Sequence, residues 1–129
     1  MALTYKRDDA IRRIVITVTG PLLAADILCV IDRQAHEGTW DYACLYDRRQ
    51  MTTGPPTLDV APIVRYIRQL ETFYGSRGPV AVVADHTGSV GVYSRLSKHV
   101  GLPFEVFDDV GDAEQWLAER GYGTASSHG

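Results

Sequence analysis

Short apolar runs alternate along this chain with longer segments in which hydrophobic residues recur every three or four positions. The runs are rich in valine, isoleucine and aromatic residues, which favours strands. The longer segments have the spacing of amphipathic helices. The pattern predicts strands over 3–6, 11–19, 42–46, 80–84 and 104–107, and helices over 21–36, 59–74, 89–100 and from Asp112 to just before Gly121.

This order of elements predicts an α/β fold. Helices between strands imply parallel neighbours joined by right-handed crossovers, and strands that are apolar on both sides belong to a sheet covered on both faces. Only a turn at 7–10 separates the first two strands, so we expect them to form an antiparallel hairpin. The expected architecture is a mixed, mostly parallel sheet of about five strands with four flanking helices.

The same periodicity predicts the core. In the second strand, Ile14, Ile16 and Val18 share one face. The helical stripes expected to be buried are Leu23, Ile27, Val30 and Ile31 in the first helix, Val60, Ile63, Val64, Ile67, Leu70 and Tyr74 in the second, Val92, Leu96 and Val100 in the third, and Trp116 and Leu117 in the fourth. The aromatic residues of the second helix are thereby assigned to the core, whereas Tyr93 and Tyr122 lie off the main stripes and are expected to be partly exposed.

Helix boundaries can also be predicted from local residue types. Pro21 suits the first turn of a helix, where amide hydrogens lack helical acceptors. Thr57 or Asp59 is placed to cap the second helix, and Asp112 the last one. The stretch from Met51 to Pro56 contains two consecutive prolines and is expected to be an irregular loop.

Composition narrows the class of protein. The 129 residues are 45% hydrophobic and 22% charged, which is typical of one globular domain. We expect this domain to span residues 1–122, followed by a disordered polar tail over 123–129. The net charge of −3 is too small to predict a partner, but nucleic-acid binding is disfavoured because it needs a concentrated basic surface and Arg12-Arg13 and Arg48-Arg49 are only pairs. Cys29 and Cys44 are expected to be buried, reduced thiols rather than a disulfide.

No apolar run approaches the roughly 18 residues needed to span a membrane. The first residues also lack the apolar centre of a secretory signal peptide. We therefore expect a cytoplasmic location and no membrane span.

Polar residues follow the predicted strands, where ligands of parallel sheets usually bind. The residues with suitable chemistry for a small amphiphilic or anionic ligand are Asp47, Arg48, Asp85, His86, Ser89 and Tyr93. Arg48 would hold an anionic head group. An aspartate after a strand also commonly accepts hydrogen bonds from the amides of the next loop, and this structural role remains an alternative for Asp47 and Asp85.

Catalytic and metal-binding patterns are weak. Asp85, His86 and Ser89 or Ser94 supply the residue types of a hydrolytic triad, but the chain has no Gly-x-Ser-x-Gly elbow. Neighbouring side chains such as Asp85 and His86 also leave a strand in opposite directions. The four histidines do not show the spacing of metal ligands. The sequence therefore predicts no enzyme, no metal site and no cofactor.

The order of elements and several motifs resemble the SpoIIAA-like (STAS-like) family over about residues 3 to 120. The motifs are the strand from Ile14 to Gly20, the strand end Leu45-Tyr46-Asp47-Arg48-Arg49, the stretch from Gly78 to Ala84, and the closing segment from Val106 to Leu117. The resemblance implies a mixed sheet with flanking helices. It also implies a non-catalytic role, because relatives that antagonise anti-sigma factors change partners when a serine at the start of a helix is phosphorylated.

In those relatives the serine lies in an Asp-Ser-Ser-Gly stretch, and the nearest text here is Met51-Thr52-Thr53-Gly54. The resemblance thus implies Thr52, Thr53 and Thr57 as candidate phospho-switch residues. We expect a cytoplasmic regulatory or binding domain that acts through a protein partner or as a homodimer. The alternative is a small amphiphilic ligand at the strand ends, which the outline similarity of this fold to CRAL-TRIO lipid carriers also suggests.

Overall fold

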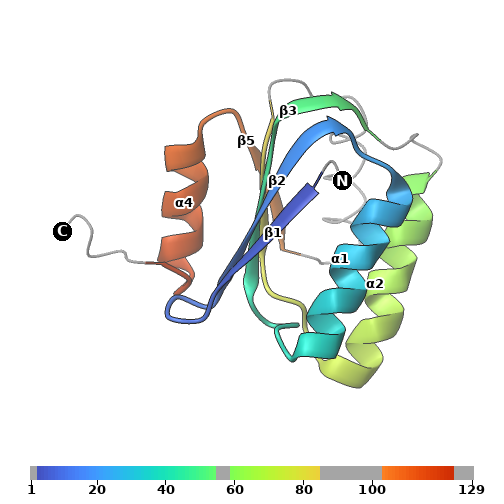
Figure 1. Ribbon diagram of the computed structural model, residues 1–129. Helices are drawn as coiled ribbons and strands as arrows, with labels where there is room; N and C mark the ends of the chain where they lie inside the picture. The colour runs from blue at the N-terminus through green and yellow to red at the C-terminus, as the bar shows by residue number, and fades with distance from the viewer. Residues whose placement is uncertain (1–2, 55–58, 85–102, 124–129) are drawn as a thin grey trace.

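The computed structural model describes residues 3–54, 59–84 and 103–123. Its strands are β1 (Leu3–Asp8), β2 (Arg13–Pro21), β3 (Ala43–Thr53), β4 (Val80–Val83) and β5 (Phe104–Phe107), and its helices are α1 (Ala24–Glu37), α2 (Val60–Tyr74) and α4 (Val110–Glu119), labelled as in Figure 1. The third predicted helix, over 89–100, lies outside the described residues.

The five strands form one sheet in the order β1-β2-β3-β4-β5. β1 pairs antiparallel with β2, and every other neighbouring pair is parallel. One row of residues in register crosses the whole sheet: Tyr5, Ile16, Tyr46, Val82 and Val106. The predicted hairpin and mostly parallel sheet are confirmed.

Helices cover both faces of this sheet. α1 and α2 lie side by side on one face, and α4 lies on the other (Figure 1). Alternating strand residues supply the two cores because successive side chains point to opposite faces. Cys44 and Tyr46 belong to the core under α1 and α2, whereas Ala43 and Leu45 pack with Leu117 of α4.

β2 and β3 both end later in the chain than their sequence patterns predict. Pro21 is the last residue of β2 rather than the start of a helix, and Met51 to Thr53 belong to β3 rather than to a loop. The ends of the two strands pair with each other: Gly20 is in register with Met51, and Pro21 with Thr53. α1 consequently begins at Ala24, which leaves Leu23 outside the helix and 60% exposed instead of buried.

Two aromatic assignments in α2 are wrong. Ile63, Val64 and Ile67 are buried as predicted, but Tyr74 is 51% exposed and Phe73 is 81% exposed. Both stand in the last turn of the helix, where Gly75 ends it. Tyr122 is half-buried, in agreement with the expected partial exposure.

Three smaller expectations also change. Asp109, not Asp112, caps α4, and its side chain accepts a hydrogen bond from the Asp112 amide at 3.2 Å. Asp59 occupies the N-cap position of α2 but makes no capping hydrogen bond through its side chain. Cys29 is exposed rather than buried, because it lies on the outer side of α1, while Cys44 is buried in β3.

Within the described ranges, no helix combines the length and apolar character that a membrane crossing requires.

Candidate functional site

Among the described residues, β2 and β3 alone continue the sheet at the end where a ligand was expected. Asp47 is in register with Val83, the last residue of β4, whereas β3 continues to Thr53 alongside β2. Register shifts interrupt the β2–β3 pairing between Thr17 and Thr19 and again between Gly20 and Pro21. β-bulges of this kind bend and twist strands. This narrow end is the candidate site of the sequence analysis.

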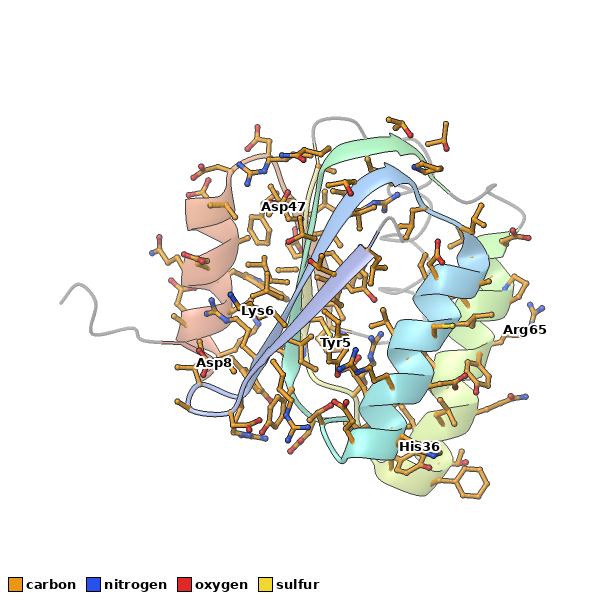
Figure 2. The ribbon with its side chains drawn as sticks, in the orientation of Figure 1. Tyr5, Lys6, Asp8, His36, Asp47 and Arg65 are labelled. Carbon is orange, nitrogen blue, oxygen red and sulfur yellow. The ribbon has the colours of Figure 1, made fainter. Side chains whose placement is uncertain are left out.

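Asp47 is engaged by its own strand. Its carboxylate accepts hydrogen bonds from the Arg49 guanidinium at 2.9 and 2.7 Å and from the Arg49 amide at 3.2 Å. These bonds stabilise the ionised form, so the Arg49 side chain lowers the pKa of Asp47 below its usual value. Strand alternation puts Asp47 on the face that α4 covers, and Figure 2 shows it at this end of the sheet.

Arg48 lies on the opposite face from Asp47. It is buried on the α1 and α2 side, where its Nε and Nη2 atoms lie 3.2 and 3.1 Å from the Met51 sulfur. The two candidates therefore do not converge on one ligand. The other proposed ligand-binding residues, Asp85, His86, Ser89 and Tyr93, lie outside the described residues.

Two of the three candidate switch threonines, Thr52 and Thr53, lie at the end of β3. Thr52 and Thr53 are exposed, and the Thr53 carbonyl accepts a hydrogen bond from the Leu22 amide at 2.8 Å. This bond ties Thr53 to the segment that leads into α1. Thr53 therefore lies next to the segment that precedes the first helix. Thr57 lies outside the described residues.

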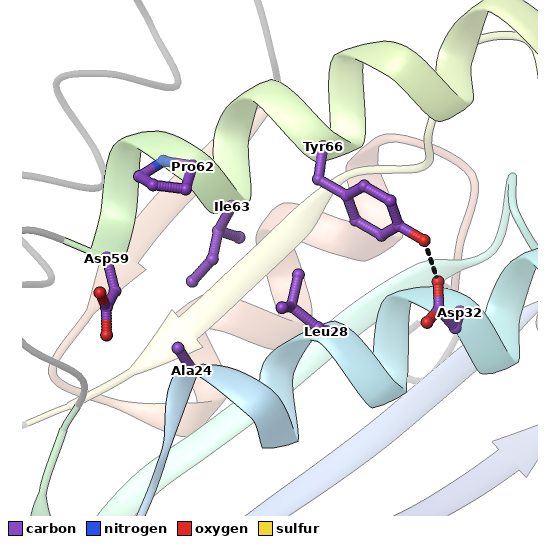
Figure 3. A pocket seen from close by; sticks show the side chains of 7 residues that line it. All are labelled: Ala24, Leu28, Asp32, Asp59, Pro62, Ile63 and Tyr66. Carbon is purple, nitrogen blue, oxygen red and sulfur yellow. Dashed lines mark hydrogen bonds between the residues drawn. The ribbon is translucent and has the colours of Figure 1, made fainter.

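A groove of about 440 Å³ runs between α1 and α2. Its walls come from one side of each helix, with residues at four-residue spacing on α1. It is lined by Ala24, Leu28, Asp32, Asp59, Pro62, Ile63 and Tyr66. Figure 3 shows the apolar side chains in the middle, with Asp59 at one end and Asp32 at the other. The groove is thus an apolar channel with a carboxylate at each end.

Tyr66 and Asp32 connect the two walls of the groove. The Tyr66 hydroxyl donates a hydrogen bond to Asp32 Oδ1, from α2 to α1 (Figure 3). Because ionised Tyr66 could not donate this bond, the carboxylate raises the pKa of Tyr66. This contact holds the Asp32 carboxylate at the edge of the groove.

The hydrophobic pattern does not predict this groove. Its helical spacing assigns the aromatic residues of the second helix to the core, yet Tyr66 lines the groove and Phe73 is exposed. One signal was present: Ala24, Leu28 and Asp32 recur every four residues just beside the buried stripe of α1. A helix edge of this kind indicates a neighbour, but it does not indicate how far away the neighbour lies.

A buried polar cluster lies at the other end of the same layer. Arg77 donates to Gln34 Oε1 at 2.7 Å, and the Cys44 thiol donates to the same oxygen at 3.3 Å. Burial raises the pKa of Cys44, although the nearby Arg77 charge opposes this effect. A buried thiol with a raised pKa is a poor nucleophile, so this cluster has a structural role.

Metal-binding chemistry finds little support in the part of the chain that the structure describes. Those residues contain no cluster of three or more histidine, cysteine, aspartate or glutamate side chains able to hold an ion.

No protein-family model matches this chain, and no curated protein matches it in sequence. Solved structures do match. An uncharacterised DUF3478-family protein from Shewanella loihica PV-4, with a SpoIIAA-like fold, covers 90% of this chain and 92% of its own at a TM-score of 0.56. The chain has a SpoIIAA-like fold.

A second solved structure supports the same conclusion. The anti-sigma factor antagonist SpoIIAA in its unphosphorylated form superimposes over 91% of this chain and 98% of its own, with a TM-score of 0.55. Sequence identities are 18% for the Shewanella protein and 12% for SpoIIAA. At such low identity the likeness extends to the SpoIIAA-like fold and not to residue roles, so the expected fold is confirmed.

Proposed function

We propose that this chain is a non-catalytic regulatory domain that acts through contacts with other proteins. The observation that carries the proposal is the SpoIIAA-like fold, which covers about nine-tenths of the chain in both matches. One of these matches is an anti-sigma factor antagonist studied in its unphosphorylated form. A protein described in those terms works by opposing another protein, and a similar role fits this chain.

The tip of β3 is the best-supported location for a switch. Thr52 and Thr53 are exposed, so a kinase can reach their hydroxyl groups. A phosphate adds nearly two negative charges and three strong acceptor oxygens. Because the Thr53 carbonyl is bonded to the Leu22 amide, that charge would appear beside the positive end of the α1 dipole. The change would alter a surface that a partner contacts.

Phosphomimetic variants test this role. Thr52→Glu and Thr53→Glu should each change the set or the amount of proteins that the chain retains from its native cell extract, measured by quantitative mass spectrometry. Thr4→Glu is the matched control because Thr4 is an exposed threonine on β1, the strand at the edge of the sheet. If both β3 variants retain the same proteins as the wild type and the control, the switch proposal is wrong.

A small ligand at the strand ends has less support. Asp47 and Arg48 lie on opposite faces of β3, and each contacts a side chain close to it in the same strand. We therefore retain protein contact as the proposed function.

A further inference from the structure

The groove between α1 and α2 has two properties that together indicate an occupant. Its middle is apolar, formed by Ala24, Leu28 and Ile63, and its ends carry the carboxylates of Asp32 and Asp59. Among the described residues that line it, none is basic. An apolar centre with an acidic group at either end complements a segment that is apolar in the middle and basic at its ends.

The apolar surface continues along α2 beyond the groove. At 100° per residue, Pro62, Tyr66 and Phe73 lie on one side of the helix. A rise of 1.5 Å per residue places Phe73 about 16 Å from Pro62, which is about three helical turns. Phe73 is 81% exposed, the most exposed of the large hydrophobic residues in the described ranges. A partner lying along this side would cover it.

Asp32 and Asp59 differ in how they are held. The Tyr66 hydroxyl bonds Asp32 from the opposite wall and fixes its position at the groove edge. Asp59 stands at the N-cap of α2 without a capping hydrogen bond from its side chain, so its oxygens are not committed to the helix backbone. The two carboxylates thus lie at opposite ends of the apolar section, suited to two separate cations.

We propose that this groove binds an amphipathic helix of a protein partner, with apolar residues facing Leu28 and Pro62 and with lysine or arginine near each end. This proposal rests on the proposed function, because it specifies the kind of partner contact. A partner helix in this groove would bury its apolar side against α1 and α2, as amphipathic helices do in the hydrophobic grooves of other proteins. Sites for small ligands usually enclose most of the ligand's surface. Because this groove is open, it favours a helix over a small cation.

Two designed helical peptides provide the test. Both carry leucines along one side, and they differ only in having lysine or glutamate at the two ends of that side. Fluorescence anisotropy with the full chain at low salt should show that the basic peptide binds about tenfold more tightly than the acidic one. Equal affinity for the two peptides would overturn the proposal.

Variants locate the binding surface. Phe73→Ala should weaken binding of the basic peptide about tenfold, as expected for an aromatic anchor. The Asp32→Asn, Asp59→Asn double variant should weaken it about fivefold, and Asp32→Lys should narrow or reverse the preference for the basic peptide. Glu119→Gln, an exposed change on α4 across the sheet, is the control and should have no effect. Unchanged affinity in the groove variants would place the peptide elsewhere.

Circular dichroism of each variant checks that a loss of peptide binding does not result from unfolding. Asp32 and Phe73 are exposed, so their variants should fold like the wild type. Two other occupants would overturn the proposal. One is a dimer of the free chain that Phe73→Ala dissociates, and the other is spermidine that binds the groove and displaces the peptide.

The same variants separate this inference from the proposed function. If proteins that respond to Thr53→Glu still bind the Phe73→Ala and Asp32→Lys variants at wild-type affinity, the groove is not their docking site. The regulatory role at β3 would then stand without the groove. If no protein responds to Thr53→Glu but the basic peptide binds as described, the groove stands and the switch does not.

Discussion

At Gly78, a neighbouring stretch of backbone leaves no room for a Cβ atom. Gly78 lies in the buried segment between α2 and β4, and a Cβ added to it would come within 2.2 Å of the Tyr42 carbonyl oxygen and 2.6 Å of the Asp41 oxygen. Both obstacles are backbone atoms, which cannot rotate away. Gly78→Ala should therefore lower the free energy of unfolding by about 2 to 3 kcal/mol, measured by urea denaturation.

Gly38 provides the contrast at the end of α1. Its φ of 76° lies in the left-handed region, but a Cβ there would meet no atom within 4 Å. Gly38→Ala should cost only about 1 kcal/mol, from backbone strain alone. If Gly78→Ala lowers the free energy of unfolding by no more than Gly38→Ala does, the backbone at Gly78 does not lie as close to Asp41 and Tyr42 as described here.

The two cysteines should react at very different rates. Cys29 is exposed on α1, while Cys44 is buried and burial raises its pKa. A thiol reagent such as DTNB should modify one thiol of the folded chain rapidly and the second only as the chain unfolds. Cys29→Ser should remove the fast phase, and Cys44→Ser should preserve it. A fast phase that persists in Cys29→Ser would contradict the burial of Cys44.

Tyr5 should couple stability to alkaline pH. Burial, and to a lesser extent the Glu37 charge, raise the pKa of Tyr5 to about 12, and its hydroxyl donates to Glu37 at 3.1 Å. The folded state therefore retains the Tyr5 proton after the unfolded state has lost it near pH 10. Stability from Tyr5 is complete below pH 10 and is lost as the pH rises toward 12.

Tyr5→Phe tests this coupling. The variant should be less stable than the wild type at pH 8, and the difference should shrink between pH 10 and 12, measured by denaturation at each pH. Tyr42→Phe is the comparison, because the pKa of the half-buried Tyr42 is raised chiefly by its hydrogen bond to Asp9. A constant difference between Tyr5→Phe and wild type across this range would mean that Tyr5 titrates normally.

At the scale of elements, α4 is held to the sheet by a buried arginine as well as by its apolar side. The Nε and Nη2 atoms of Arg13 donate to the Tyr122 carbonyl, just after α4, at 3.0 and 2.6 Å. Nη1 also lies 3.8 Å from the Glu114 carboxylate. A guanidinium can make both bonds to the carbonyl because its donors form a rigid fork, which an ammonium group does not provide.

Arg13→Lys should therefore loosen α4 selectively. We expect the free energy of unfolding to fall by about 1 to 2 kcal/mol, because one or both charge-assisted hydrogen bonds are lost. Hydrogen exchange should accelerate at amides of α4 and remain unchanged in α1. Arg12→Lys is the matched control, since Arg12 is exposed and its salt bridge with Asp41 lies on the surface. Equal acceleration in both helices would mean that Arg13 stabilises the whole fold rather than α4.

Hydrophobic periodicity predicted the elements well because it reports burial directly. Ile14, Ile16 and Val18 were placed on one face of a strand, and all three are fully buried under α1 and α2. Strand ends were harder to predict. Pro21 and Thr53 look like loop residues in isolation, but each extends a strand because its partner lies alongside.

The groove could not be predicted for a related reason. Tyr66 and Leu28 lie at the edges of their buried stripes, where helical spacing alone does not separate core from surface. Their position depends on the gap between α1 and α2, which is set by packing of both helices on the sheet. Asp47 and Arg48 illustrate the same limit, because a candidate site of adjacent strand residues divides between two faces.

At the scale of the whole molecule, a single sheet contributes side chains to two hydrophobic cores, one on each of its faces. Residues such as Ala43 and Cys44 are neighbours in β3 but belong to opposite layers, so neither core can form without the strands that support the other. The described part of the chain should therefore unfold in a single cooperative transition, as small single domains usually do.

The two tryptophans allow this expectation to be tested, since each reports on one layer. Trp40 is buried under α1 and α2, where its indole donates to the Gly75 carbonyl at 2.8 Å. Trp116 packs on the α4 side, where the centroid of its ring lies 5.8 Å from the centroid of the Phe107 ring. Because the chain has two tryptophans, Trp40→Phe and Trp116→Phe each leave a single fluorescent probe.

Within each variant, fluorescence and far-ultraviolet circular dichroism should give the same midpoint and the same slope in urea. The two variants themselves will differ in stability, because Trp40→Phe loses a hydrogen bond, so the comparison is between probes and not between variants. If the α4 layer were an independent unit, Trp116 fluorescence would change at a lower urea concentration than circular dichroism in Trp40→Phe. A difference of that kind would mean that the sheet does not couple its two cores.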